Sequence, residues 1–359
     1  MSTDSTLPTC PAIANAAGLE HFAAGDPAAA ERLLRHAYRL LVDEPAILVN
    51  LGLALMQQGQ VEPAERCYRL ALRSRELRVR RSAAKNLGFL LLWRGDFAEG
   101  WHWHGQRFAG EAFEANQWRG EPLDGAVLTV WNDVGMGDAF QFVRYTLPLV
   151  QRGERVRWAV EASQIPLFRT RLAWPLHAVV DRSGIDRTAG PQIPLMGLIP
   201  LLDPSTGWGR RFAQPTWTTS ATPDPTGTGL CWASNPNDRT MHVYKSAPVE
   251  RLLQLATGAR QLVSLQTDEP EAHQRLGLQP PTRDWISSLD RLAACERVIS
   301  VDTAVAHLAA GAGRPVELLL GNPPDWRWRW FAHLGPGLWY PSLRCQPLRP
   351  APRSAAAAP

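Results

Sequence analysis

The spacing of apolar positions along this chain changes near residue 122. Before that point, small and large apolar residues recur at the three- and four-residue intervals of α-helices. After it, short apolar runs are separated by polar loops and by helical stretches, a pattern typical of strands alternating with helices. The sequence therefore predicts an all-helical N-terminal part followed by an α/β part.

The helical part repeats one pattern of residues. Gly18, Gly52 and Gly88 occupy equivalent positions, thirty-four and then thirty-six residues apart, each followed by large residues at matching places. Small residues let paired helices approach closely, while the large ones fill the groove between them. This is the spacing of tetratricopeptide (TPR) helix pairs, which we place at residues 11–112. Three such repeats are about the minimum number for a stable stack.

The α/β part is predicted to form two Rossmann-like lobes, at residues 122–226 and 227–346. Strands are expected over 126–131, 155–160, 229–234, 261–265, 297–301 and 315–320, and helices over 139–150, 247–257 and 285–295. Residues 161–212 carry many prolines and weak periodicity, and 213–228 have the composition of an inter-domain linker. The Pro/Ala-rich tail, 347–359, is expected to be disordered.

Composition limits the class of protein. No apolar run approaches the length of a membrane span, and the N-terminus lacks the basic-then-apolar pattern of a secretory signal. The five cysteines have neither CxxC spacing nor partnered histidines, so we expect no zinc site, no disulfide framework and a cytoplasmic location. The net charge is +4 and the arginines are spread out apart from a short run at 73–81, which disfavours nucleic-acid binding.

The strand predicted to end at residue 301 is followed by polar residues and a helix of small residues. In such sheets ligands bind where strands end and a helix N-terminus offers free N–H groups. Asp302 and Thr303 lie at that place, and His307 follows Thr303 by one helical turn on the same face. They predict a site for a phosphorylated ligand. The alternatives are that Asp302 or Thr303 caps the helix and that His307 is bonded inside the helix–sheet interface.

A second strand–helix turn contains Gly135, Gly137 and Asp138. Glycines allow close approach of the backbone to a ligand, and Asp138 could act as a general base toward an acceptor hydroxyl. The alternative is that Asp138 only caps the helix.

Lys245 follows a loop at 235–240 and could neutralise a diphosphate leaving group. A solvent-exposed lysine is the alternative, and Arg239 is a competitor for the role. The segment 325–330, with Trp339 and Tyr340, could stack on sugars and bases or pack the C-terminal segment onto the first lobe.

Three common signatures are absent from the sequence: a GxxxxGK[ST] loop, an Asp-x-Asp pair and a GxSxG elbow. A P-loop kinase, a metal-dependent sugar transferase and an α/β-hydrolase are therefore disfavoured.

A set of motifs occurs in one order along the chain, namely Trp131, Gly135-Met-Gly-Asp138, Gln141-Phe142, Arg144-Tyr145, Trp232-Ala, Asn235-Pro, Ser264-Leu-Gln266, Asp302-Thr, His307-Leu-Ala, Asp325-Trp-Arg-Trp328 and Trp339-Tyr-Pro-Ser342. In these the chain resembles the bacterial TPR-containing glycosyltransferases related to the heptosyltransferases (glycosyltransferase family nine). It is also distantly similar to protein O-linked N-acetylglucosamine transferases. The resemblance implies a GT-B fold, which is two Rossmann-like lobes, and inverting transfer from a nucleotide-diphosphate sugar with no metal or other cofactor.

By this resemblance, Asp138 matches the catalytic base, and Lys245 matches the cation that offsets charge on the departing nucleoside diphosphate. The expected nucleotide-sugar contacts are Gly135, Gly137, Asn235, Gln266, Asp302, Thr303, Ala304 and His307.

The chain also departs from the family pattern. Asn132-Asp133 replaces Glu-Gln, Ser234 replaces a glycine, Lys245-Ser246 replaces Arg-Ser, and the first lobe is short. Two hypotheses are therefore kept. One is a glycosyltransferase whose repeats select a protein or glycan acceptor, with a peptide held in the TPR groove. The other is an interaction scaffold carrying a non-catalytic GT-B module.

Overall fold

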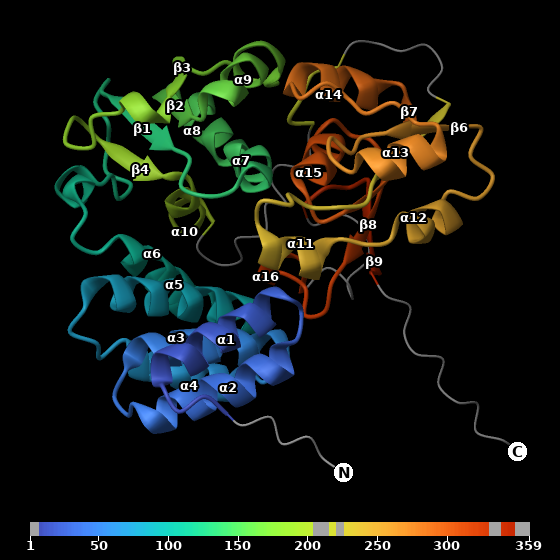
Figure 1. Ribbon diagram of the computed structural model, residues 1–359. Coiled ribbons are helices and arrows are strands. Elements are labelled where there is room, and N and C mark those ends of the chain that lie inside the picture. Colours follow the sequence, from blue (N-terminus) through green and yellow to red (C-terminus); the bar gives the residue numbers. More distant parts are fainter. Residues whose placement is uncertain (1–6, 204–214, 220–225, 330–338, 349–359) are drawn as a thin grey trace, which may run out of the picture. The chain divides into compact units, whose positions relative to one another are not determined.

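The computed structural model describes residues 7–203, 215–219, 226–329 and 339–348 (Figure 1). The chain divides into two compact units. The first contains Met1–Gly110 together with two later segments, Asn237–Tyr244 and Asn322–Arg329. The second contains Glu111–Pro236, Lys245–Gly321 and Trp330–Pro359.

The first unit is built from consecutive helix pairs joined by short turns. The helices are α1 (Pro11–Ala23), α2 (Pro27–Leu40), α3 (Pro45–Gln57), α4 (Val61–Ala71), α5 (Leu77–Arg94) and α6 (Phe97–Gly105). Proline begins the first three, where its missing N–H costs no helical hydrogen bond. Asp26 caps α2 by accepting the Ala29 N–H at 2.9 Å.

The same close contact occurs in each pair, and it involves the repeated glycines. Gly18 faces Leu34 and Gly52 faces Tyr68, each across its own helix pair. A Cβ at Gly52 would lie 2.4 Å from the Tyr68 ring, and one at Gly88 would lie 2.6 Å from the backbone nitrogen of His104. The repeated helix pairs predicted from small residues are thus confirmed.

The two later segments of the first unit contact its helices. The Tyr244 ring lies 5.5 Å from that of Phe22, and the Tyr244 hydroxyl donates to the Phe22 carbonyl oxygen at 3.1 Å. In the other segment, α16 (Trp326–Arg329) places Trp326 edge-on to Trp101, with ring centroids 5.4 Å apart. Both segments lie within the range predicted for the second lobe, 227–346.

The first sheet of the second unit is parallel, in the order β3-β2-β1-β4. Its strands are β1 (Val127–Trp131), β2 (Arg155–Val160), β3 (Ala178–Asp181) and β4 (Gln192–Pro194). The predictions for 126–131 and 155–160 are confirmed. In the region of weak periodicity the structure adds β3, β4, α9 (Ile165–Arg171) and α10 (Leu198–Leu202).

The prediction of a single helix over 139–150 is wrong. The structure has α7 (Met136–Phe142), a 3-10 turn at Val143–Thr146 and α8 (Leu147–Gln151). Pro148 explains the interruption, because it has no N–H to donate to the preceding turn and its ring crowds that turn. The tighter 3-10 turn joins the two short helices.

The second sheet is also parallel, in the order β6-β5-β7-β8-β9. Its strands are β5 (Gly227–Cys231), β6 (Gln261–Ser264), β7 (Cys295–Val301), β8 (Val316–Leu320) and β9 (Leu343–Pro347). The accompanying helices are α12 (Val249–Leu255), α13 (Pro270–Leu276), α14 (Trp285–Ala293) and α15 (Ala304–Gly311), while α11 (Arg239–Lys245) ends at the boundary with the first unit.

Two expectations for this region need correction. The strand placed at 229–234 begins and ends earlier, so β5 takes the last two residues of the predicted linker 213–228. Within that linker Trp217 is buried, and its ring lies 5.5 Å from Phe140 and 5.3 Å from Phe168. Much of the remaining linker, and residues 349–359 of the predicted tail, lie outside the described residues. No helix in the described ranges is both long enough and apolar enough to cross a bilayer.

Candidate functional site

The candidate site lies where β7 ends and α15 begins, in the second unit. β7 lies between β5 and β8, so the carboxyl ends of three parallel strands come together here. Thr303 occupies the N-cap position of α15 in an extended conformation, but its side chain makes no capping hydrogen bond. Its hydroxyl lies 3.4 Å from Ser300 Oγ and 3.7 Å from Cys231 Sγ. The first turn of α15 therefore presents N–H groups that the Thr303 hydroxyl does not cap.

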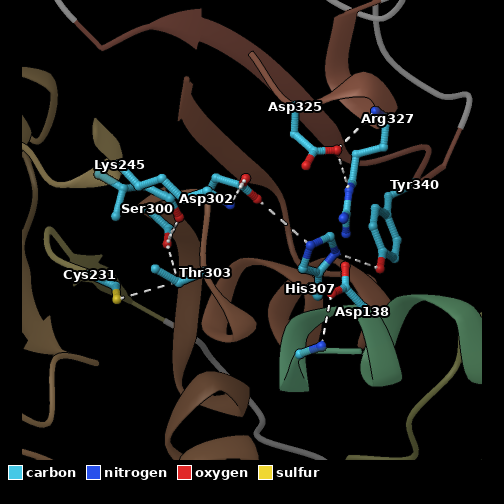
Figure 2. A network of polar contacts seen from close by, with 12 residues as sticks. Asp138, Cys231, Lys245, Ser300, Asp302, Thr303, His307, Asp325, Arg327 and Tyr340 are labelled. Carbon is cyan, nitrogen blue, oxygen red and sulfur yellow. Dashed lines mark hydrogen bonds and ion pairs between the residues drawn. The ribbon is translucent and has the colours of Figure 1, made fainter. Parts of the chain in front are cut away.

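Three charged or titratable side chains form a row beside this turn (Figure 2). The Lys245 ammonium donates to Asp302 Oδ2 at 2.7 Å. On the other side, Asp302 Oδ1 lies 3.8 Å from His307 Nε2. The Lys245 side chain is 30% exposed, that of Asp302 only 9% and that of His307 2%. Lys245 is thus paired rather than merely solvated, and of the two candidate cations it is the one bonded to Asp302.

His307 is also bonded inside the fold, as its alternative interpretation predicted. Its Nδ1 lies 3.1 Å from the Tyr340 hydroxyl, and both residues are buried. Because the Nε2 side faces Asp302, both nitrogens of the ring are engaged at the start of α15. The structural alternative is thus present at this residue, and contact of His307 with a phosphorylated ligand stays a prediction.

The glycine turn of the first lobe lies against this same helix. A Cβ at Gly137 would be 3.0 Å from His307 Cδ2 and 3.3 Å from the Ala304 Cα. The two strand–helix turns singled out in the sequence therefore meet in the second unit. Asp138 accepts the Gly135 N–H through Oδ2 at 3.1 Å, so the predicted helix-capping contact is present.

Gln266 reaches the site through β5. Its Oε1 accepts the Ala233 N–H at 3.0 Å and lies 3.5 Å from the Cys231 sulfur, which in turn neighbours Thr303. Burial raises the pKa of the Cys231 thiol to about 11, so it remains a protonated, weak donor at neutral pH.

The remaining predicted residues lie in looser surroundings. Asn235 is exposed on the loop after β5, while the preceding Ser234 donates its N–H to Ser246 Oγ at 3.0 Å. Ser234, which replaces the glycine of the family pattern, therefore contacts Ser246, the residue after Lys245. Arg239 is exposed and lies 3.9 Å from Glu20 within the first unit.

The aromatic residues near the C-terminus pack inside the protein. The Trp339 ring lies 5.5 Å from Phe142, and its carbonyl oxygen accepts Arg144 Nη1 at 2.6 Å. The Arg144 guanidinium lies 4.4 Å from the centre of the Tyr340 ring. For Trp339 and Tyr340 this confirms packing onto the first lobe; Trp330 lies outside the described residues.

Sequence reasoning identified neither Arg144 nor Ser300 as site residues. Arg144 was named only as part of the motifs shared with the family. Nothing in the sequence distinguished it from an ordinary surface arginine. Among the described residues, no cluster of His, Cys, Asp or Glu has the grouping needed to hold a metal ion.

Comparison with known proteins gave matches only among solved structures. No family model and no curated protein matches the chain. The glycosyltransferase TibC of enterotoxigenic E. coli, described as bacterial, iron-containing and dodecameric, is 12% identical at a TM-score of 0.39, covering 54% of this chain and 57% of that one. A mutant O-GlcNAc transferase of Thermobaculum terrenum is 18% identical at a TM-score of 0.36, covering 91% of this chain and 78% of its own.

The E. coli heptosyltransferase WaaC with ADP is 15% identical at a TM-score of 0.41, covering 61% of this chain and 92% of its own. This chain thus spans little more than half of TibC. Likeness at this level carries no argument about the present chain, so its function has to be inferred from its own residues.

Proposed function

We propose that this chain is a glycosyltransferase that moves a sugar from a nucleotide-diphosphate donor to an acceptor hydroxyl. The observation that carries the proposal is the row Lys245–Asp302–His307 beside the N-terminus of α15, with Gly137 packed on the same turn. A diphosphate is an anion that helix N–H groups and a lysine favour, and here Lys245 shares its charge with the Asp302 carboxylate. The residues thus offer cationic and dipolar groups where a leaving diphosphate would gain charge.

In the proposed reaction the acceptor oxygen attacks the anomeric carbon while Asp138 takes the hydroxyl proton. The bond between that carbon and the diphosphate oxygen breaks, and the nucleoside diphosphate leaves with the electron pair. One displacement inverts the configuration. An ionised carboxylate has about four lone-pair sites, so the Gly135 contact of Asp138 is compatible with accepting this proton.

The remaining features of the proposal concern arrangement and partners. We place the two α/β lobes in a GT-B arrangement that needs no metal, with Lys245 and α15 offsetting the charge. The repeated helix pairs are proposed to be TPR repeats that select a protein or glycan acceptor in the cytoplasm, a peptide lying in their groove. Their support is the common spacing of Gly18, Gly52 and Gly88.

A thermal-shift panel with ADP, UDP, GDP and their sugars tests the proposal. A ligand at a hundred times its dissociation constant should stabilise the protein by about 2.7 kcal/mol. Lys245→Met should weaken the shift, and Arg239→Met is the matched control because Arg239 is exposed and its side chain is 73% accessible. A stabilising nucleotide should then be followed by an assay for released nucleoside diphosphate.

Failure of every nucleotide to stabilise the wild-type chain would contradict the proposal. The scaffold hypothesis would then be favoured, in which Asp138 serves only to cap α7 and the helix pairs bind a partner.

A further inference from the structure

Arg144 is a buried cation in the second unit, with its side chain almost entirely removed from solvent. Its guanidinium donates to the carbonyl oxygens of Gln141 and Trp339, each at 2.6 Å, and lies 3.5 Å from Thr216 Oγ1. Within the described ranges no carboxylate bonds to it. Burying a charge without a counterion is costly, so carbonyl dipoles and the Tyr340 ring must offset that cost.

The ring beneath this cation connects it to the candidate site. The guanidinium carbon lies 4.4 Å from the centre of the Tyr340 ring, and the hydroxyl of that ring lies 3.1 Å from His307 Nδ1. A cation over the ring draws electron density from the phenol and makes its O–H a better donor. Figure 2 shows His307 between Tyr340 on one side and Asp302 on the other.

The surroundings of His307 favour one tautomer. Asp302 Oδ1 lies 3.8 Å from Nε2, and a carboxylate favours an N–H on the nitrogen that faces it. On this ground we expect the proton on Nε2, which would make Nδ1 an acceptor. The Tyr340 hydroxyl is able to donate to it, because a phenol both donates and accepts.

We propose that Arg144 and Tyr340 are positioning residues that hold neutral His307 in the tautomer protonated at Nε2. The Nε2–H then points toward Asp302 beside the first turn of α15. The tautomer assignment stands without any ligand. Its consequence for ligand binding, a Lys245–Asp302 pair held in place beside the first turn of α15, rests on the proposed function.

Imidazole ¹⁵N chemical shifts test the assignment directly, because they separate protonated from unprotonated ring nitrogens. The experiment uses the full chain labelled at its nine histidines, with His307 assigned by the loss of its signals in His307→Gln. In the wild type we expect a protonated Nε2 and an unprotonated Nδ1. In Tyr340→Phe the two shifts should move toward each other as the tautomers mix. A wild-type Nδ1 that carries the proton, or shifts unchanged in Tyr340→Phe, would overturn the proposal.

Two further variants separate the polar chain from packing. Trp339→Phe keeps the backbone carbonyl that Arg144 binds but trims the ring that packs on Phe142, so it should lower the melting temperature without altering the tautomer. Arg144→Lys keeps a charge but loses the flat guanidinium, and should shift the tautomer part of the way. If Trp339→Phe mixes the tautomers as much as Tyr340→Phe does, then packing, and not the phenol hydroxyl, controls the tautomer of His307.

Nucleotide affinity then tests the consequence for binding. For whichever diphosphate stabilises the wild type, Tyr340→Phe should raise the dissociation constant by about three- to tenfold, the effect of one misaligned hydrogen bond. An unchanged constant beside a changed tautomer would overturn the link to binding. If no nucleotide in the panel binds, the proposed function is contradicted. The tautomer assignment is then judged by the ¹⁵N shifts alone.

Discussion

Single residues at the candidate site have structural and proposed chemical roles at once. Asp138 accepts the Gly135 N–H and is also the proposed base, and His307 is bonded to Tyr340 while facing Asp302. A carboxylate has enough lone pairs to serve in both ways, whereas both ring nitrogens of His307 already face protein partners. Substitutions that keep the structural contact and remove only the proposed chemistry are therefore the most informative.

Asp138→Asn meets that requirement. The amide oxygen of asparagine can still accept the Gly135 N–H, so the start of α7 should be retained. A neutral amide cannot take a proton from the acceptor, so turnover should fall by about 10²- to 10⁴-fold while nucleotide affinity changes little. Turnover is measured as released nucleoside diphosphate, with Asp133→Asn as the control because Asp133 instead bonds the Met196 N–H. Wild-type turnover in Asp138→Asn would exclude Asp138 as the base.

His104 provides a prediction about pH at the scale of one residue. Burial, followed by the nearby charges of Arg107 and Lys85, holds the pKa of His104 well below its ordinary value of 6.5. Below about pH 6.5 the unfolded chain therefore binds a proton that the folded chain does not, and the free energy of unfolding should fall by up to about 1.4 kcal/mol per pH unit. Denaturant unfolding at a series of pH values measures this slope.

The matched variant for this slope is His104→Phe, which places another ring beside Phe89 and Trp101 without a titrating group. It should unfold with a shallower dependence on acid pH. Equal slopes in the two proteins would show that His104 does not titrate abnormally.

At the scale of elements, the sequence predicted what local pattern controls. The strands β1, β2, β7 and β8 could be predicted because each has five or more residues, most of them buried and therefore apolar. β4 could not be recognised, because it has three residues and ends in a proline. The interruption between α7 and α8 was missed because apolar periodicity continues through it, although Pro148 removes the helical hydrogen bond.

In the candidate site, too, local patterns could be predicted and long-range contacts could not. Asp302, Thr303 and His307 could be predicted because one strand–helix turn carries all three. Arg144 contacts the Trp339 carbonyl across 195 residues of sequence, and no local pattern specifies such a contact.

The close helix contact at Gly88 gives a prediction for the third helix pair. A methyl group there would lie 2.6 Å from the backbone nitrogen of His104 and 2.8 Å from its Cα, atoms that cannot rotate away. Gly88→Ala should therefore lower the free energy of unfolding by about 1–3 kcal/mol through overpacking. Gly105→Ala is the control: a Cβ there meets nothing within 4 Å, and alanine should raise stability by up to about 1 kcal/mol. Circular dichroism during urea unfolding measures both, and a neutral Gly88→Ala would contradict this close packing of α5 on α6.

At the scale of the whole molecule, the division into units does not follow the order of the sequence. Segments 237–244 and 322–329 group with the helix pairs, although the sequence placed them in the last α/β lobe. Composition gave no sign of this, because Tyr244 and Trp326 could equally have served the core of that lobe. Part of the helical surface is therefore covered by the chain itself.

The contact between Trp101 and Trp326 tests this covering directly. Each single alanine variant should lose stability, by about 3–5 kcal/mol if the burial of its ring is fully lost. The edge-on pair should add a coupling of about 0.5–1.5 kcal/mol, so the double variant should be destabilised by less than the sum of the singles. Trp103→Ala supplies the control on the same helix, because its indole N–H bonds the exposed Glu99 instead. Combined with Trp326→Ala it should show no coupling. If Trp101→Ala and Trp326→Ala prove strictly additive in urea unfolding, segment 322–329 does not rest on α6 in solution, and the helical surface remains open to a partner.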